Sequence, residues 1–386
     1  MSQYTIYNRP AEQASGSPAH LASLDGLRFV AAMHIVLFHT MHLAWLRPVT
    51  WGSTSTSLFF ILSGFVLAYA YTTAEGGLRV PARVFWRRRF ARLYPLAVLT
   101  QLAVIPFVWH RYPAEERVPR ATAALTGVQG WFPRIADSFN SPGWSLSVLA
   151  FCYLLFPVLA WALRGWSARR LAWALAATWA ASLLPITAAL LGGAGEYWRS
   201  AVHHHPLSRF PEFVFGVVLA RLFVTLPSVQ VPRGTVGAVV ALLAAALVLL
   251  PDAAYPLAHN GLLAPLHGLL IVALAAGGGV LARGLAAPPL RAMGRASFAV
   301  FLLHVPVYSW VMIPLAPTLT RMPLPVRIAG YAGYLALAVV AAWAAQRWVA
   351  DPIAGAIGGR RGAAASKAAA IRPRLAGLTA PSPKDG

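Results

Sequence analysis

The stretch Leu24–His39, LDGLRFVAAMHIVLFH, is apolar enough to cross a membrane, yet it carries Arg28 and His39 eleven residues apart. Helical residues advance by about 100° each, so eleven steps make roughly three turns plus 20°, which places both side chains on one face, about 16 Å apart along the axis. Ionisable side chains are costly in lipid and usually face the interior of a helix bundle, where they serve function. This pair indicates a membrane protein with a polar path along its first span.

The composition of the whole chain supports this interpretation. Of its 386 residues, 58% are hydrophobic and 11% are charged, with a mean hydropathy of +0.61. Soluble domains carry about 25% charged residues, so we expect an all-α, multi-pass protein of the cell (plasma) membrane with about ten transmembrane helices. The spans are predicted near residues 24–45, 54–72, 88–109, 144–163, 171–192, 208–226, 235–251, 261–282, 296–315 and 327–349.

The positive charge of the chain predicts its orientation. The net charge is +21, and with the N-terminus inside, most Lys and Arg residues fall on cytoplasmic segments. Both termini are therefore predicted inside, with contacts to anionic lipids rather than nucleic acid. Residues 1–20 are expected to form a cytoplasmic segment, 21–352 the membrane domain, and 353–386 a disordered basic tail. The longest outside connection, 110–143, is expected to hold a short interfacial or re-entrant helix.

Three histidines on or near the first span are candidates for acid–base chemistry. Imidazole titrates near neutral pH and can take a proton from a hydroxyl, which makes His39 a candidate general base. The alternative is a buried histidine bonded to a neighbouring helix. His34 lies about 120° from the direction of Arg28 and is expected to be structural, while His42, about 60° from His39, is kept as a second candidate.

A run of arginines opens the third span. The segment Phe85–Leu96, FWRRRFARLYPL, contains four of them. Arg89 and Arg92 are spaced i,i+3, share a face and form a fork suited to phosphate groups. Anchoring on lipid phosphates is the alternative, and it suffices for Arg87 and Arg88.

Six motifs in order resemble a known family. They are LDGLR with His39 eleven residues after its Arg, SLFFILSGF (57–65), RRFARLYP (88–95), PGWSLS (142–147), RFPEFVFG (209–216) and SFAVFLLHVP (297–306). From about residue 21 to 352 the chain thus resembles the integral-membrane acyltransferases of acyltransferase family 3, which O-acylate surface sugars and some secreted natural products.

The resemblance implies an acyltransferase without a tightly bound cofactor that uses acetyl-CoA or another acyl-CoA as co-substrate. The acceptor would be a hydroxyl of a glycan, a lipid-linked sugar or a small glycosylated metabolite. On this view Arg89 and Arg92, with Arg88 beside them, hold the donor, Arg28 positions the donor or its acyl carbonyl, and His39 acts as the base. Arg28 and His39 are expected to face the donor and acceptor ends of a single channel.

Other residues in or near the matched motifs are expected to line the channel or the acceptor site. They are Trp144, Ser145, Tyr153, Arg209, Glu212 and His304. Structural alternatives remain open for several: an interfacial aromatic with a helix cap at 144–145, and an ion pair between Arg209 and Glu212. Ser63 and Gly64 are expected to permit close helix packing. The run His203–His205 resembles a metal site, but adjacent histidines splay apart, and no metal site is predicted.

One position departs from the family pattern. Relatives commonly carry a Glu a few residues after WSL, whereas this chain has Leu149 there. Three hypotheses remain for the chain: an O-acyltransferase, a transporter or flippase of a sugar-like substrate whose path the intramembrane charges line, and, because of Leu149 alone, a catalytically impaired relative. Full activity of His39→Ala and Arg28→Ala variants would refute the first hypothesis, and substrate flux without acyl-CoA consumption would favour the second.

Overall fold

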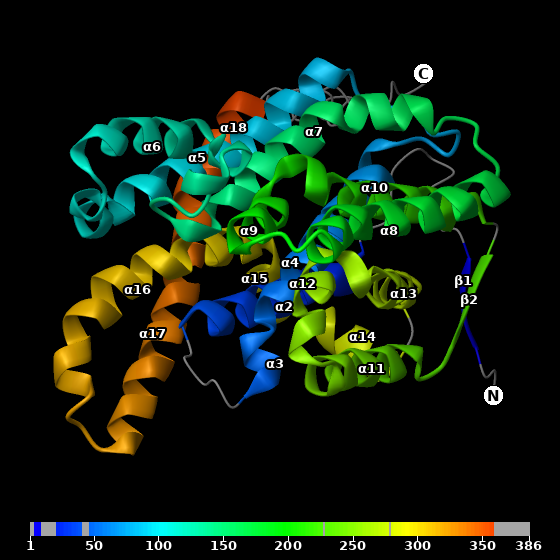
Figure 1. Ribbon diagram of the computed structural model, residues 1–386. Helices are drawn as coiled ribbons and strands as arrows, with labels where there is room; N and C mark the ends of the chain where they lie inside the picture. Colours follow the sequence, from blue (N-terminus) through cyan, green and yellow to red (C-terminus); the bar gives the residue numbers. More distant parts are fainter. Residues whose placement is uncertain (1–3, 9–20, 41–45, 227, 278, 359–386) are drawn as a thin grey trace, which may run out of the picture.

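The computed structural model describes residues 4–8, 21–40, 46–226, 228–277 and 279–358, and this part of the chain is almost entirely helical (Figure 1). Within it, seven helical segments are long and apolar enough to cross a membrane, or up to nine if two bent pairs each count as one span. The all-α, multi-pass prediction is therefore confirmed. The long helices are α2 (Ala22–Thr40), α4 (Ser55–Tyr71), α5 (Ala82–Val108), α7 (Trp144–Ala162), α8 (Ala168–Leu191), α16 (Ser297–Leu319) and α17 (Leu324–Ala345).

Three of the ten predicted spans differ from simple apolar helices. Helix α10 (Pro206–Thr225) covers the predicted span 208–226, but it carries three charged residues. Helix α11 (Thr235–Leu249) stops before Pro251, and the chain then turns by 116° into 252–262, because proline cannot continue the helix. Helix α13 (Ala264–Ala275) ends near Gly277, whose φ of +81° is accessible to glycine.

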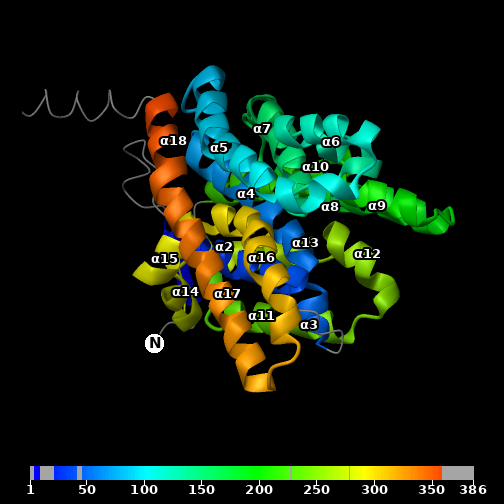
Figure 2. The same cartoon turned by 90° about the vertical axis from the view of Figure 1, so that its left-hand side faces the viewer.

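Short elements connect the long helices. They are α3 (Arg47–Thr50), α6 (Ala114–Thr126), α9 (Glu196–His204), α12 (Tyr255–Leu257), α14 (Gly279–Leu285), α15 (Pro288–Arg295) and α18 (Asp351–Gly358). Helix α6 confirms that the connection 110–143 holds a short helix. Figure 2 shows α17 and α18 as one long column, so helix continues to Gly358, past the predicted start of the tail; residues 359–386 lie outside the described part.

A small antiparallel ribbon was not predicted from the sequence. Strand β1 (Tyr4–Asn8) pairs with β2 (Ser228–Pro232), and Tyr4 lies opposite Pro232. Two five-residue strands are too short to give a strong alternating pattern, and only the pairing between distant segments reveals them.

Glycines set the closest helix contacts around the centre of the fold. A Cβ at Gly64 would clash with the carbonyl of Phe213, and one at Gly216 would clash with that of Ile61, so α4 and α10 pack with their backbones in contact. Small residues allow such approach in membrane bundles, and the prediction for Gly64 is confirmed. Gly294 in α15 lies equally close to the backbone of Asp25 in α2.

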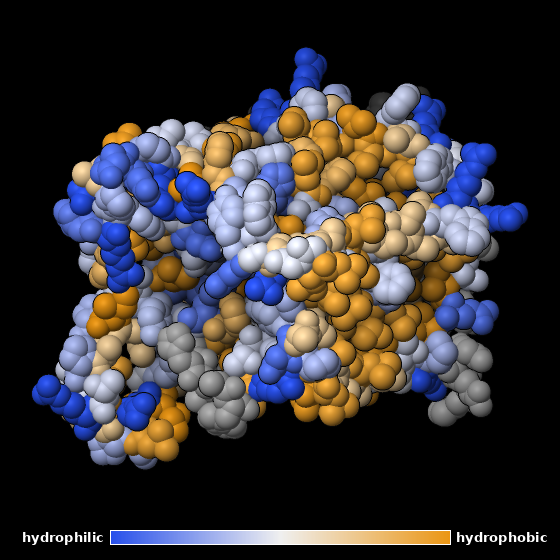
Figure 3. Space-filling view, viewed as in Figure 1, coloured by the Kyte–Doolittle hydropathy of each residue, from blue (hydrophilic) through white to orange (hydrophobic). Residues whose placement is uncertain are grey.

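Apolar side chains form much of the outer surface. Figure 3 shows a broad hydrophobic area over α8 and α11, whereas hydrophilic residues gather over α6. Trp173, Leu184, Leu242 and Leu249 are among the exposed large side chains there. Such a surface is typical of helices that face lipid.

Candidate active site

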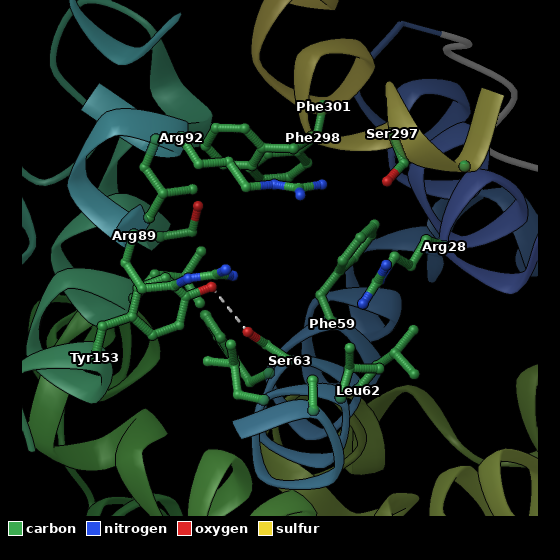
Figure 4. Close-up of a pocket in the computed structure, with 18 of the residues that line it drawn as sticks. Arg28, Phe59, Leu62, Ser63, Arg89, Arg92, Tyr153, Ser297, Phe298 and Phe301 are labelled. Atoms are coloured by element: carbon green, nitrogen blue, oxygen red, sulfur yellow. Dashed lines mark hydrogen bonds between the residues drawn. The ribbon is translucent and has the colours of Figure 1, made fainter. Parts of the chain in front are cut away.

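Two cavities lie at opposite ends of α2. The first, here called the arginine cavity, has a volume of about 240 Å³ and is lined by Arg28, Arg89 and Arg92. Figure 4 shows the three guanidinium groups reaching into one space from α2 and α5. The start of α2, the end of α4 and the start of α5 meet here, so residues more than sixty positions apart share one site.

The arginine cavity carries an excess of positive charge. Arg28 pairs with Asp25 (Nη1 to Oδ1, 3.0 Å), which the contact with Gly294 holds in place. Arg89 donates a hydrogen bond from Nη2 to the hydroxyl of Tyr71 (2.6 Å), and its guanidinium lies 4.9 Å from that ring's centroid. Arg92 lines the cavity and is also exposed, so the cavity opens beside it. Three arginines against one carboxylate suit an anion with several phosphate groups.

The deeper walls of the arginine cavity are mostly apolar. Phe59, Phe298 and Leu149 line it, together with a polar pair in which the hydroxyls of Ser63 and Tyr153 lie 2.9 Å apart (Figure 4). The cavity is smaller than the roughly 300–1,000 Å³ of pockets for drug-sized ligands. It has room for a slender, mainly apolar chain below a charged mouth.

The second space, here called the histidine cavity, has a volume of about 210 Å³. It lies where α2 ends, α4 and α7 begin and α9 ends. Its polar lining consists of His39, Ser53, Thr56, Asp137, Ser141, His203, His204, Tyr255 and His259, and its apolar lining of Phe38, Pro142, Trp144 and Phe301.

A hydrogen-bonded chain fixes the protonation of His39. Nδ1 of His304 lies 2.7 Å from the carbonyl of Phe301, which can only accept, so this nitrogen carries the proton. In the neutral ring Nε2 of His304 is then an acceptor, and it lies 3.2 Å from Nδ1 of His39. Nδ1 of His39 therefore carries a proton, shared with the carbonyl of Ile35 at 3.1 Å. Nε2 of His39 is left unprotonated, as a general base requires.

The two cavities meet at a common wall. Thr56 and Phe301 line both of them. The sequence predicted a single channel with Arg28 and His39 at its ends; the structure instead divides this path into two cavities with Thr56 and Phe301 between them. Phe301, whose position the sequence could not predict, is the larger of the two shared residues.

The structure distributes the predicted channel residues unevenly. Trp144 lines the histidine cavity, whereas Ser145 and Tyr153 line the arginine cavity. His304 lies behind His39 and lines neither cavity, and Arg88 is exposed outside both.

Arg209 and Glu212 line neither cavity. They form a fully buried pair (Nη2 to Oε2, 3.0 Å), and Nη1 of Arg209 donates to the carbonyl of His259 and to Oδ1 of Asn260, each at 2.7 Å. The alternative of an ion pair is thus present. Through the hydrogen bond to the carbonyl of His259, Arg209 supports the backbone of that residue.

Other histidines have separate structural partners. His34 contacts the hydroxyl of Ser55 through Nδ1 and the carbonyl of Pro48 through Nε2, both at 2.7 Å, as expected for a structural residue. The run 203–205 splays: His203 stacks on His259, His204 faces Asp137, and His205 packs on Trp131. Among the described residues, no three His, Cys, Asp or Glu side chains converge as metal ligands. His42 lies outside the described residues.

Sequence reasoning missed most of the histidine cavity. Asp137 lies in a turn just before the motif at 142–147, and His259 lies in the short helical segment 258–262; neither belongs to a motif, and only the fold brings them to the cavity that His39 lines. In the arginine cavity, Tyr71 was missed as a partner of Arg89 because nothing in its local sequence distinguishes it from an interfacial aromatic. Leu149, noted as a departure from the family pattern, lines the arginine cavity rather than the space around His39.

The fold and these cavities define the class: a multi-pass membrane protein with a cationic cavity and a histidine-containing cavity that share a wall inside the bundle. Residues 21–347 match the family described as "Acyltransferase domain". The chain belongs to this family, the membrane acyltransferases of acyltransferase family 3.

Named relatives agree with this assignment. The chain is 32% identical over 320 residues to acyltransferase MdmB of Streptomyces mycarofaciens, an alignment that covers 75% of this chain and 79% of that protein. It is 28% identical over 154 residues to peptidoglycan O-acetyltransferase OatA of Listeria monocytogenes, covering 36% of this chain and 24% of that protein. O-acetyltransferase OatA of Staphylococcus aureus gives 28% over 155 residues, covering 37% of this chain and 25% of that protein. No solved structure matches the chain.

Proposed function

We propose that this protein transfers an acyl group, with acetyl as the first expectation, from acyl-CoA to a hydroxyl of a glycan, a lipid-linked sugar or a small glycosylated metabolite. The observation that carries the proposal is the hydrogen-bonded chain from the carbonyl of Phe301 through His304 to Nδ1 of His39, together with the place of His39 in a cavity that meets the arginine cavity at Thr56 and Phe301. A base and an anion site at one common wall are what acyl transfer from a phosphorylated thioester requires.

The arginine cavity is the proposed donor site. Arg89 and Arg92 would hold donor phosphates at its mouth, and Arg28, anchored by Asp25, would position the thioester arm. The apolar walls suit the arm and its acyl group. The thioester carbonyl would lie at the common wall, the place nearest to both cavities. With the predicted orientation in the plasma membrane, this cavity faces the cytoplasm, where acyl-CoA is made.

The histidine cavity is the proposed acceptor site. Nε2 of His39 takes the proton from an acceptor hydroxyl as its oxygen forms a bond to the thioester carbonyl carbon. The carbon–sulfur bond then breaks, the acceptor leaves as an ester, and the CoA thiolate recovers a proton from the His39 imidazolium. His304 acts through His39 by holding the tautomer, without touching either substrate.

Labelled acetyl-CoA tests this proposal with protein purified into lipid vesicles and a panel of sugar acceptors. We expect a base-labile labelled product from the unaltered protein and none from His39→Gln. His110 is exposed and lines neither cavity, so His110→Gln serves as the matched control and should retain activity. Labelled ester formation by His39→Gln at the unaltered rate would overturn the assignment. Movement of an acceptor across the vesicle without consumption of acetyl-CoA would instead support a transporter.

A further inference from the structure

The size of the histidine cavity limits what it can hold. About 210 Å³ lies below the roughly 300 Å³ at which pockets for drug-sized ligands begin, so the cavity itself has room for a single sugar ring. Trp144 and Tyr255 supply aromatic walls on which the C–H face of a sugar ring can pack. The remaining lining is rich in hydrogen-bonding groups.

The stacked imidazoles of the cavity are electrically neutral. The rings of His203 and His259 lie parallel with centroids 3.3 Å apart. Two cations at this spacing would repel strongly, so both rings cannot be protonated together. Burial lowers the pKa of His203 well below its usual range, and the neighbouring His204 and Arg209 lower it further. These rings offer hydrogen bonds to hydroxyls and no positive charge to an anion.

Asp137 supplies the negative charge of the cavity. Its Oδ1 lies 3.3 Å from Nε2 of His204, and its side chain is 59% exposed, whereas that of His204 is 9% exposed. Burial lowers the pKa of His204, an effect that the facing Asp137 opposes, and burial raises the pKa of Asp137, an effect that the facing imidazole opposes. In its neutral form His204 can donate its Nε2–H to the carboxylate. The nearby Arg209 lies outside the cavity lining and is paired with Glu212, with Nη2 and Oε2 3.0 Å apart.

From this arrangement we infer that the histidine cavity selects a single neutral or cationic sugar ring as acceptor and rejects anionic sugars, with Asp137 as the residue that determines this selection. The inference rests on the proposed function and names the acceptor class for the same site. The donor and acceptor cavities then have opposite electrostatic character. An anionic donor is drawn to the arginines and kept out of the acceptor site.

Three acceptors with the same ring test this inference: the methyl glycoside of a neutral hexose, its dimethylamino derivative and the corresponding uronic acid. The measurement is kcat/KM for labelled acetyl transfer to each, in lipid vesicles. We expect the uronic acid to be at least tenfold poorer than the neutral sugar, which corresponds to about 1.4 kcal/mol, and the dimethylamino sugar to be at least as good as the neutral one.

The variant Asp137→Asn should reduce the ratio between neutral and anionic acceptors to less than threefold while the KM for acetyl-CoA stays unchanged. Asp252→Asn is the matched control, because Asp252 is an exposed carboxylate paired with Arg47 outside the cavity, and it should keep the original ratio. Equal kcat/KM for all three acceptors, or an unchanged ratio in Asp137→Asn, would overturn the charge selection while leaving acyl transfer intact. A protein that acetylates none of the three sugars would overturn the proposed function itself, and the inference with it.

Discussion

Replacement of His304 tests the hydrogen bond that fixes the tautomer of His39. His304→Leu places an apolar side chain of similar volume at this fully buried position. It removes the acceptor Nε2, which lies 3.2 Å from Nδ1 of His39. His39 would then be held in its reactive tautomer by the carbonyl of Ile35 alone. A net hydrogen bond contributes about 0.5–1.5 kcal/mol, which corresponds to a fall in kcat of about 2- to 13-fold.

The variant His304→Gln separates this role from packing. The glutamine carbonyl can accept the proton of His39 Nδ1, so we expect kcat within about twofold of the unaltered protein. The assay is the initial rate of acetyl transfer at saturating acetyl-CoA, with the KM for acetyl-CoA as an internal control. That KM should stay constant, because His304 lines neither cavity. Equal losses of kcat in the Leu and Gln variants, or an unaltered kcat in His304→Leu, would refute the tautomer argument.

Three further predictions concern the arginine cavity and its wall. Arg89→Gln removes a charge-assisted contact of about 1.5–3 kcal/mol and should raise the KM for acetyl-CoA about 10- to 150-fold. Arg88 lies outside the cavity, so the control variant Arg88→Gln should leave this KM within twofold. Equal KM values for the two variants would contradict the donor site. Phe301→Ala opens the common wall between the two cavities. We therefore expect the hydrolysis of acetyl-CoA in the absence of acceptor, measured as release of free CoA, to rise severalfold. Unchanged hydrolysis would exclude Phe301 as the barrier to water. Leu149→Glu places a carboxylate among the arginines and should raise the KM for acetyl-CoA without raising kcat; a higher kcat would mean that an acid is needed at this place.

The sequence predicted the features that depend on local pattern. Apolar runs located the long helices. The eleven-residue spacing predicted Arg28 and His39 on one face of the first span, and in the structure Arg28 lines one cavity and His39 the other. The i,i+3 spacing of Arg89 and Arg92 predicted a shared helix face, and both residues line the arginine cavity. These expectations depend only on helix geometry, in which residue spacing determines which side chains share a face.

Features that depend on contacts between distant segments were beyond the sequence. The place of Phe301 between the two cavities is an example, because residues from several helices far apart in the chain line those cavities with it. Arg209 and Glu212 illustrate the same limit, because their motif indicates a polar site but not whether it faces a cavity or a buried backbone. The contact between Asp137 and His204 depends on the fold, which brings the loop between α6 and α7 beside α9.

The most direct test of two cavities serving one reaction is an experimental structure with a non-hydrolysable acetyl-CoA analogue bound. We predict phosphates beside Arg89 and Arg92 and the acyl carbonyl at the wall formed by Thr56 and Phe301, facing Nε2 of His39. An analogue bound away from the arginines, or with its acyl carbonyl turned away from that wall, would contradict the account.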